Sequence, residues 1–77
     1  MTSASKTDNL DLATSAREMA DREPAGSLSH AAATSVAITC ATTRNIAEAR
    51  AVLQGVTPPD VREAALSLFT RLSAGAA

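Results

Sequence analysis

Phe69 is the only aromatic residue in this chain of 77 residues, and the scarcity of large apolar side chains limits the core that the chain can build. Apolar residues make up 45% of the sequence, but much of that fraction is alanine. Fully burying a large apolar side chain contributes about 1.5–3 kcal/mol, whereas each ordered residue costs about 1.5 kcal/mol of conformational entropy. A lone monomer of this composition is expected to be marginally stable. We therefore expect one small domain, over residues 8–75, that associates with itself or with a protein partner.

The charges nearly cancel, because seven Lys and Arg residues stand against eight Asp and Glu residues. A net charge near zero provides no electrostatic footprint for nucleic acid or for an anionic membrane surface. It also does little to discourage self-association.

The N-terminal stretch Met1–Asn9 lacks the apolar core of a signal peptide, and no stretch of the chain approaches 18 apolar residues. Residues 1–7 are small and polar and are expected to form a mobile tail. Cys40 is the only cysteine, so an internal disulfide is excluded. These features predict a cytoplasmic protein without a membrane segment.

Two segments carry clear helix signals. The first runs to Arg22, with Thr7, Asp8 or Asn9 as its N-cap and an apolar face of Leu12, Ala16, Met19 and Ala20. The last begins after Thr57, a predicted cap, with Pro58 as its first helical residue and Gly75 as a stop. Its apolar residues follow helical spacing at Val61, Ala64, Ala65, Leu68 and Leu72, and Phe69 broadens that face.

The middle segment, residues 27–54, has two interpretations. As one helix it has a coherent stripe of apolar and small residues, with His30 on the opposite, solvent-facing side. However, six of the ten residues from Thr34 to Thr43 are β-branched, and Val36, Ile38 and Cys40 alternate as in a half-buried strand. A capping box at Asn45–Glu48 could also begin a new helix. The helical stripe consists of Leu28, Ala31, Ala32, Ser35, Ile38, Thr39, Thr42, Ile46, Ala49 and Leu53.

No group of residues forms a catalytic, metal or phosphate-binding motif. His30 is the only histidine, and with Cys40 it falls short of the three or four ligands of a zinc site. We interpret His30 as an exposed bystander and Cys40 as a small buried hydrophobe, with an intermolecular disulfide across a dimer axis or a reactive thiol as the alternatives for Cys40. The three glycines form no phosphate loop. We therefore expect no enzymatic activity, no cofactor and no metal.

The run AVLQGVTPPDVREAA, residues 51–65, places a small residue four before Gly55 and a cap at Thr57. That spacing resembles a helix-turn-helix. Combined with a strand at residues 35–40, it also resembles a ribbon-helix-helix repressor or antitoxin, which implies an α+β dimer that binds DNA. The chemistry opposes DNA, because the second helix would begin with Pro59, Asp60 and Glu63, and the strand would offer no Arg, Lys, Asn or Gln to a base.

These observations predict an all-α protein, either a small helical hairpin or a three-helix arrangement, with the ribbon-helix-helix dimer as the alternative. Protein–protein interaction is the predicted function and DNA-binding regulation the alternative. Leu66 and Val36 lie towards the flanks of their stripes and are candidates for apolar surface left over for a second molecule. The whole predicted interaction face consists of Val61, Ala65, Leu66, Leu68, Phe69, Leu72 and Val36.

Overall fold

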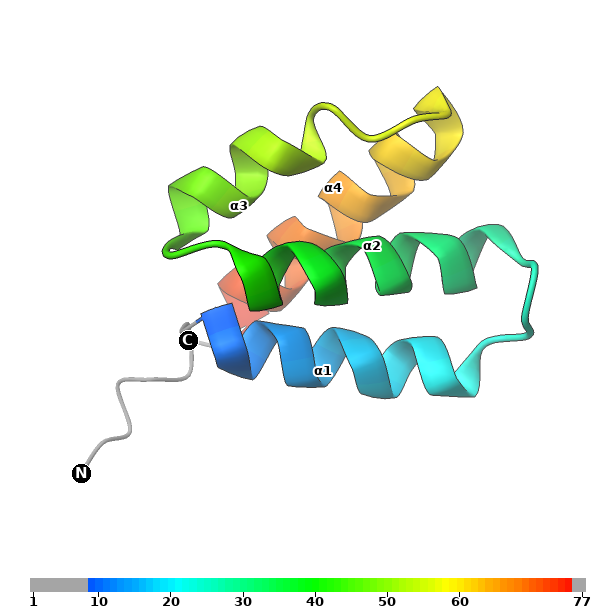
Figure 1. The fold of residues 1–77 in the computed structure, drawn as a ribbon. Coiled ribbons are helices and arrows are strands. Elements are labelled where there is room, and N and C mark those ends of the chain that lie inside the picture. Colours follow the sequence, from blue (N-terminus) through cyan, green and yellow to red (C-terminus); the bar gives the residue numbers. More distant parts are fainter. Residues whose placement is uncertain (1–8, 76–77) are drawn as a thin grey trace.

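A computed structural model describes residues 9–75, which form four helices and no strand (Figure 1). The helices are α1 (Asn9–Arg22), α2 (Leu28–Thr42), α3 (Ile46–Leu53) and α4 (Pro59–Gly75). The all-α prediction is therefore confirmed for this part of the chain. These residues form one helix more than the predicted three-helix arrangement, because the middle segment forms two helices and not one. The predicted tail, residues 1–7, lies outside the described residues.

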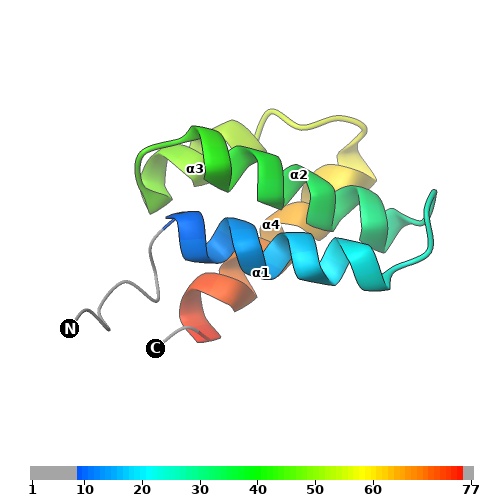
Figure 2. The ribbon, with the colours of Figure 1, turned by 60° about the horizontal axis from the view of Figure 1, so that its bottom comes forward.

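Helices α1 and α2 form an antiparallel pair, joined by a turn in which Gly26 has a φ of 87° (Figures 1 and 2). Residues other than glycine rarely adopt that backbone conformation. Ser27 then caps α2, because its side-chain oxygen accepts a hydrogen bond from the backbone N–H of His30 at 3.1 Å. The predicted apolar face of α1 is confirmed: Leu12, Ala16 and Ala20 are buried and Met19 is half-buried.

The alternative strand at residues 35–40 is not formed, since these residues lie within α2. The β-branched residues are accommodated partly by their hydroxyls: Thr42 Oγ1 donates to the Ile38 carbonyl at 2.9 Å, and Thr43 Oγ1 donates to that of Thr39 at 2.7 Å. Tertiary packing, with Val36 fully buried, overrides the local strand preference.

A single helix across the middle segment is also wrong, because the backbone at Thr43 and Asn45 is extended. The capping box there is confirmed. Asn45 Oδ1 accepts from the N–H of Glu48 at 2.8 Å, and Glu48 Oε1 accepts from the N–H of Arg44 at 2.7 Å. The chain therefore turns at this point, and α3 begins in a new direction (Figure 1).

The buried face of α2 is rotated relative to the predicted stripe. Ile38 and Leu28, placed on that stripe, are 60% and 45% exposed, whereas Val36 and Cys40 are fully buried. The physical reason is that α2 packs against both α1 and α4 and is apolar around most of its circumference, so periodicity defines its orientation weakly. Val36 is therefore part of the core and not surface left over for a partner, contrary to the prediction.

Helix α4 crosses the other helices and contributes the largest core side chain, Phe69. Its predicted start is displaced by one residue. The Pro58 carbonyl accepts from the N–H of Arg62 at 3.1 Å, so Pro58 takes the cap position that was predicted for Thr57. One cluster unites buried side chains from all four helices, and alanine is its most frequent member: Leu12, Ala16, Ala20, Ala32, Ala33, Val36, Ala37, Cys40, Ala49, Leu53, Ala65, Leu68 and Phe69.

Asn9, a predicted cap of the first helix, has a different role. Its side-chain amide is buried and donates to the Thr43 carbonyl at 3.1 Å, to Thr43 Oγ1 at 2.9 Å and to the Asn45 carbonyl at 3.2 Å. The start of α1 is thereby tied to the break between α2 and α3. The other two predicted caps, Thr7 and Asp8, lie outside the described residues.

This contact predicts that Asn9→Ala lowers the free energy of unfolding by about 1–3 kcal/mol, because acceptors at the α2–α3 junction lose their donor. Urea unfolding followed by circular dichroism would measure the change. Thr14→Ala is the matched control. Its hydroxyl is exposed and bonds only the Leu10 carbonyl of its own helix, so its effect should stay within about 0.5 kcal/mol. Equal stabilities of the two variants would contradict a tying role for Asn9.

Candidate functional site

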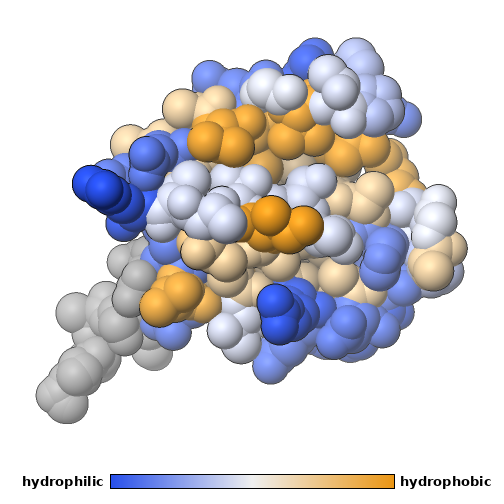
Figure 3. All heavy atoms as spheres, in the orientation of Figure 1, coloured by the Kyte–Doolittle hydropathy of each residue, from blue (hydrophilic) through white to orange (hydrophobic). Residues whose placement is uncertain are grey.

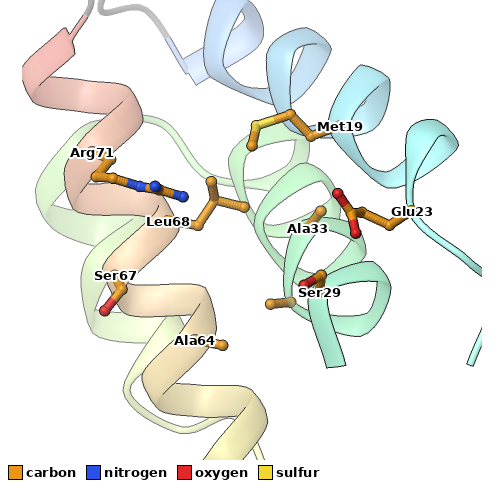
Figure 4. A pocket seen from close by; sticks show the side chains of 9 residues that line it. Met19, Glu23, Ser29, Ala33, Ala64, Ser67, Leu68 and Arg71 are labelled. Carbon is orange, nitrogen blue, oxygen red and sulfur yellow. The ribbon is translucent and has the colours of Figure 1, made fainter. Parts of the chain in front are cut away.

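A groove lies between α1 and α4, and α2 forms its floor (Figure 4). Its volume is about 450 Å³, within the range of ligand-binding sites. Three helices are needed to form it, so residues distant in sequence line one surface: Met19, Glu23, Ser29, Ala32, Ala33, Ala64, Ser67, Leu68 and Arg71.

The floor of the groove consists of small and apolar side chains. Ala32 and Ala33 are buried in α2, and Ala64 is half-buried in α4. Both alanines belong to the core cluster and are 3% and 1% exposed, so a molecule in the groove would mainly contact the side chains that border this floor. Leu68 and the half-buried Met19 border this floor, and methionine adapts its shape to whatever it contacts.

The walls of the groove carry opposite charges. Glu23 follows directly after α1, and Arg71 belongs to α4; Figure 4 shows both side chains extending towards the groove from opposite walls. Glu23 is half-buried and Arg71 is exposed. With respect to the other described residues, neither side chain forms an ion pair or a hydrogen bond. The charges therefore remain available to a molecule that lies between them.

The predicted interaction face divides between core and groove. Ala65, Leu68 and Phe69 are buried. Val61, Leu66 and Leu72 are half-buried, and Leu66 and Leu72 pack against the core. Leu68 is the one member of that predicted face that lines the groove.

Arg50 covers one edge of the core beside this face. Its guanidinium carbon lies 5.3 Å from the centre of the Phe69 ring, within the range of a cation–π contact. Its Nη1 also donates to Thr70 Oγ1 at 3.4 Å. These contacts link α3 to α4, and they give Arg50 a structural role.

Sequence reasoning missed Glu23, Ser29, Ser67 and Arg71 as members of one site. Glu23 follows α1 and Arg71 lies within α4, and no short motif joins them. Only the packing of α1 and α4 on α2 brings them to one groove, so no local signal could have identified the site.

His30 was predicted to be an exposed bystander, and this is wrong. The residue is half-buried, and its Nδ1 lies 3.0 Å from the Ala20 carbonyl oxygen. Because a carbonyl only accepts, Nδ1 carries the proton and donates it. The ring therefore satisfies a carbonyl at the end of α1 and links α1 to the start of α2.

Cys40 is fully buried, as predicted, and burial raises the pKa of its thiol above the usual value of an exposed cysteine. The thiolate, which is the reactive form, is therefore scarce at neutral pH. In the part of the chain that the structure describes, no group of three or more His, Cys, Asp and Glu side chains could hold a metal ion.

Native protein should consequently react with iodoacetamide at pH 8 at least about tenfold more slowly than protein unfolded in urea. Because the folded thiol has the higher pKa, it keeps its proton after the unfolded thiol has lost its own. The free energy of unfolding therefore falls as the pH rises through the pKa of the unfolded thiol. Cys40→Ala should lack this part of the pH dependence. Mass spectrometry would measure labelling, and equally fast labelling of folded and unfolded protein would contradict the burial of the thiol.

None of the helices in residues 9–75 is long and apolar enough to cross a membrane. No protein-family model, no curated protein and no solved structure matches this chain.

Proposed function

We propose that this chain is a small binding protein, and that it acts by holding an amphipathic helix of a partner protein in the groove between α1 and α4. The observation that carries the proposal is an apolar, alanine-rich floor between two walls of opposite, unpaired charge. An amphipathic helix placed in a groove buries side chains at positions i, i+3, i+4 and i+7.

A partner helix would lie along the walls of the groove. Helices α1 and α4 already cover Ala32 and Ala33 of α2, so the apolar side chains of the partner would contact the half-buried Met19 and Ala64. The serine hydroxyls of Ser29 and Ser67 border this floor and can bond polar groups at the margin of such a contact. Met19 provides an adaptable apolar contact.

The charges favour one orientation of that helix. A partner residue near Arg71 should be acidic, and one near Glu23 should be basic. Such complementarity contributes to the choice of partner and to its direction in the groove more than to affinity. The reverse orientation would bring like charges together.

The described residues at the start of α4 do not favour DNA binding. The exposed side chains at the start of α4 include Asp60 and Glu63, and both are acidic. They would repel phosphate, so the turn between α3 and α4 does not favour a helix-turn-helix function.

The test is a photo-crosslinker, benzoylphenylalanine, at Ser67, which is exposed on the groove wall. Ala47, exposed on α3 and away from the groove, is the matched control position. In the native cell, the Ser67 variant should crosslink a discrete protein at a helical segment, and the Ala47 variant should not. Identical crosslinks from the two positions would contradict the proposal.

A synthetic peptide of the crosslinked segment should then bind the isolated chain, as measured by calorimetry. Arg71→Glu should weaken binding at least about tenfold, because it places two carboxylates on the groove walls. Arg44→Glu, also an exposed charge reversal, should leave the affinity unchanged because Arg44 lies outside the groove. Equal losses in both variants would show that binding depends on net charge and not on the groove.

A further inference from the structure

The acidic wall of the groove lies in a turn and not within a helix. Glu23 is the first residue after α1, and residues 23–27 connect α1 to α2. This turn lies at the right-hand edge of the molecule in the orientation shared by Figures 1 and 3. None of its residues is buried, so hydrogen bonds, and not burial in the core, have to hold Glu23 beside the groove.

The sequence removes one hydrogen-bond donor at the end of α1. In a continuous α-helix the Ala20 carbonyl would accept from the N–H of the fourth residue after it, but that residue is Pro24, which has no N–H. The Ala20 carbonyl accepts instead from the N–H of Glu23 at 3.1 Å and from Nδ1–H of His30 at 3.0 Å. Glu23 and His30 therefore share one carbonyl oxygen.

The backbone of His30 closes the same turn from the side of α2. Its N–H donates to Ser27 Oγ at 3.1 Å, and the Ser27 N–H donates to the Pro24 carbonyl at 3.1 Å. The groove residue Ser29 is the neighbour of His30 in the chain. His30 thereby links two residues that line the groove, Glu23 through the shared carbonyl and Ser29 through the backbone.

We infer that His30 is a positioning residue of the groove, because its Nδ1–H bond to the Ala20 carbonyl holds Glu23 where a basic residue of the partner can meet the carboxylate. His30 does not itself line the groove, so it acts through Glu23 and not by contact with the partner. The inference rests on the proposed function, since it says how that site keeps its acidic wall in place.

The first test needs no partner and follows amide hydrogen exchange by NMR. His30→Leu keeps a side chain of similar size but lacks the donor, so the N–H of Glu23 should exchange about threefold to tenfold faster, the change that one net hydrogen bond produces. His30→Asn should exchange as the native chain does, because Asn Nδ2 is bonded to Cγ as Nδ1 of histidine is. The N–H of Phe69, whose side chain is fully buried, should be unchanged in both variants.

Two outcomes of the exchange test would overturn the inference. One is a Glu23 N–H that exchanges equally fast in the native chain and in His30→Leu. The other is an equal acceleration at Glu23 and Phe69, which would show a loss of global stability and not a local role. His30→Ala also lacks the donor, and it replaces His30→Leu if circular dichroism shows that the leucine variant does not fold.

The second test uses the synthetic peptide of the segment that crosslinks at Ser67, in a double-mutant cycle measured by calorimetry. Glu23→Gln should weaken peptide binding about twofold to fivefold in the native chain and have no effect in His30→Leu. His30→Asn should restore the effect of Glu23→Gln. Arg71→Gln should weaken binding equally in the native and His30→Leu backgrounds, because Arg71 belongs to α4.

The two tests separate a failure of this inference from a failure of the proposed function. If Glu23→Gln weakens peptide binding equally with histidine and with leucine at position 30, the positioning role of His30 is overturned and the groove remains the binding site. If no protein crosslinks at Ser67, the proposed function fails, and with it any role of His30 in binding a partner.

Discussion

Alanine at the helix contacts is the constraint on which the rest of this structure depends. Ala16 and Ala20 of α1 and Ala33 and Ala37 of α2 are buried, and α1 and α2 pack against each other, so small side chains let the helix backbones lie close together. Close packing replaces the burial of large side chains with many short dispersion contacts between backbones. Phe69 is then the single large ring available to fill the space that remains.

The central position of α2 determines where the groove lies and which side of the helix pair stays uncovered. Because α1 and α4 each pack along α2, the groove forms between them and α2 becomes its floor. The opposite side of the α1–α2 pair stays uncovered, and Ile38 remains exposed there. The break at Thr43, tied by Asn9, turns the chain so that α3 packs beside α4 and does not extend α2 over that side.

The sequence predicted the elements that have local causes and failed where tertiary packing decides. The capping box at Asn45 and the apolar spacing of the last helix are local, and both predictions are confirmed. The orientation of α2 was wrong because Ala, Val, Ile and Thr alternate too evenly to define one face, so Val36 was placed outside and Ile38 inside. The site could not be predicted from the sequence, since Glu23 and Arg71 come to the walls of one groove only when α1 and α4 pack on α2.

The groove has no internal symmetry, and this bears on its proposed partner. Glu23 follows α1, Arg71 belongs to α4, and the floor between them belongs to α2. No two-fold axis relates those two walls, so a second copy of the chain gains no matched pairs there. An asymmetric groove therefore suits a different protein.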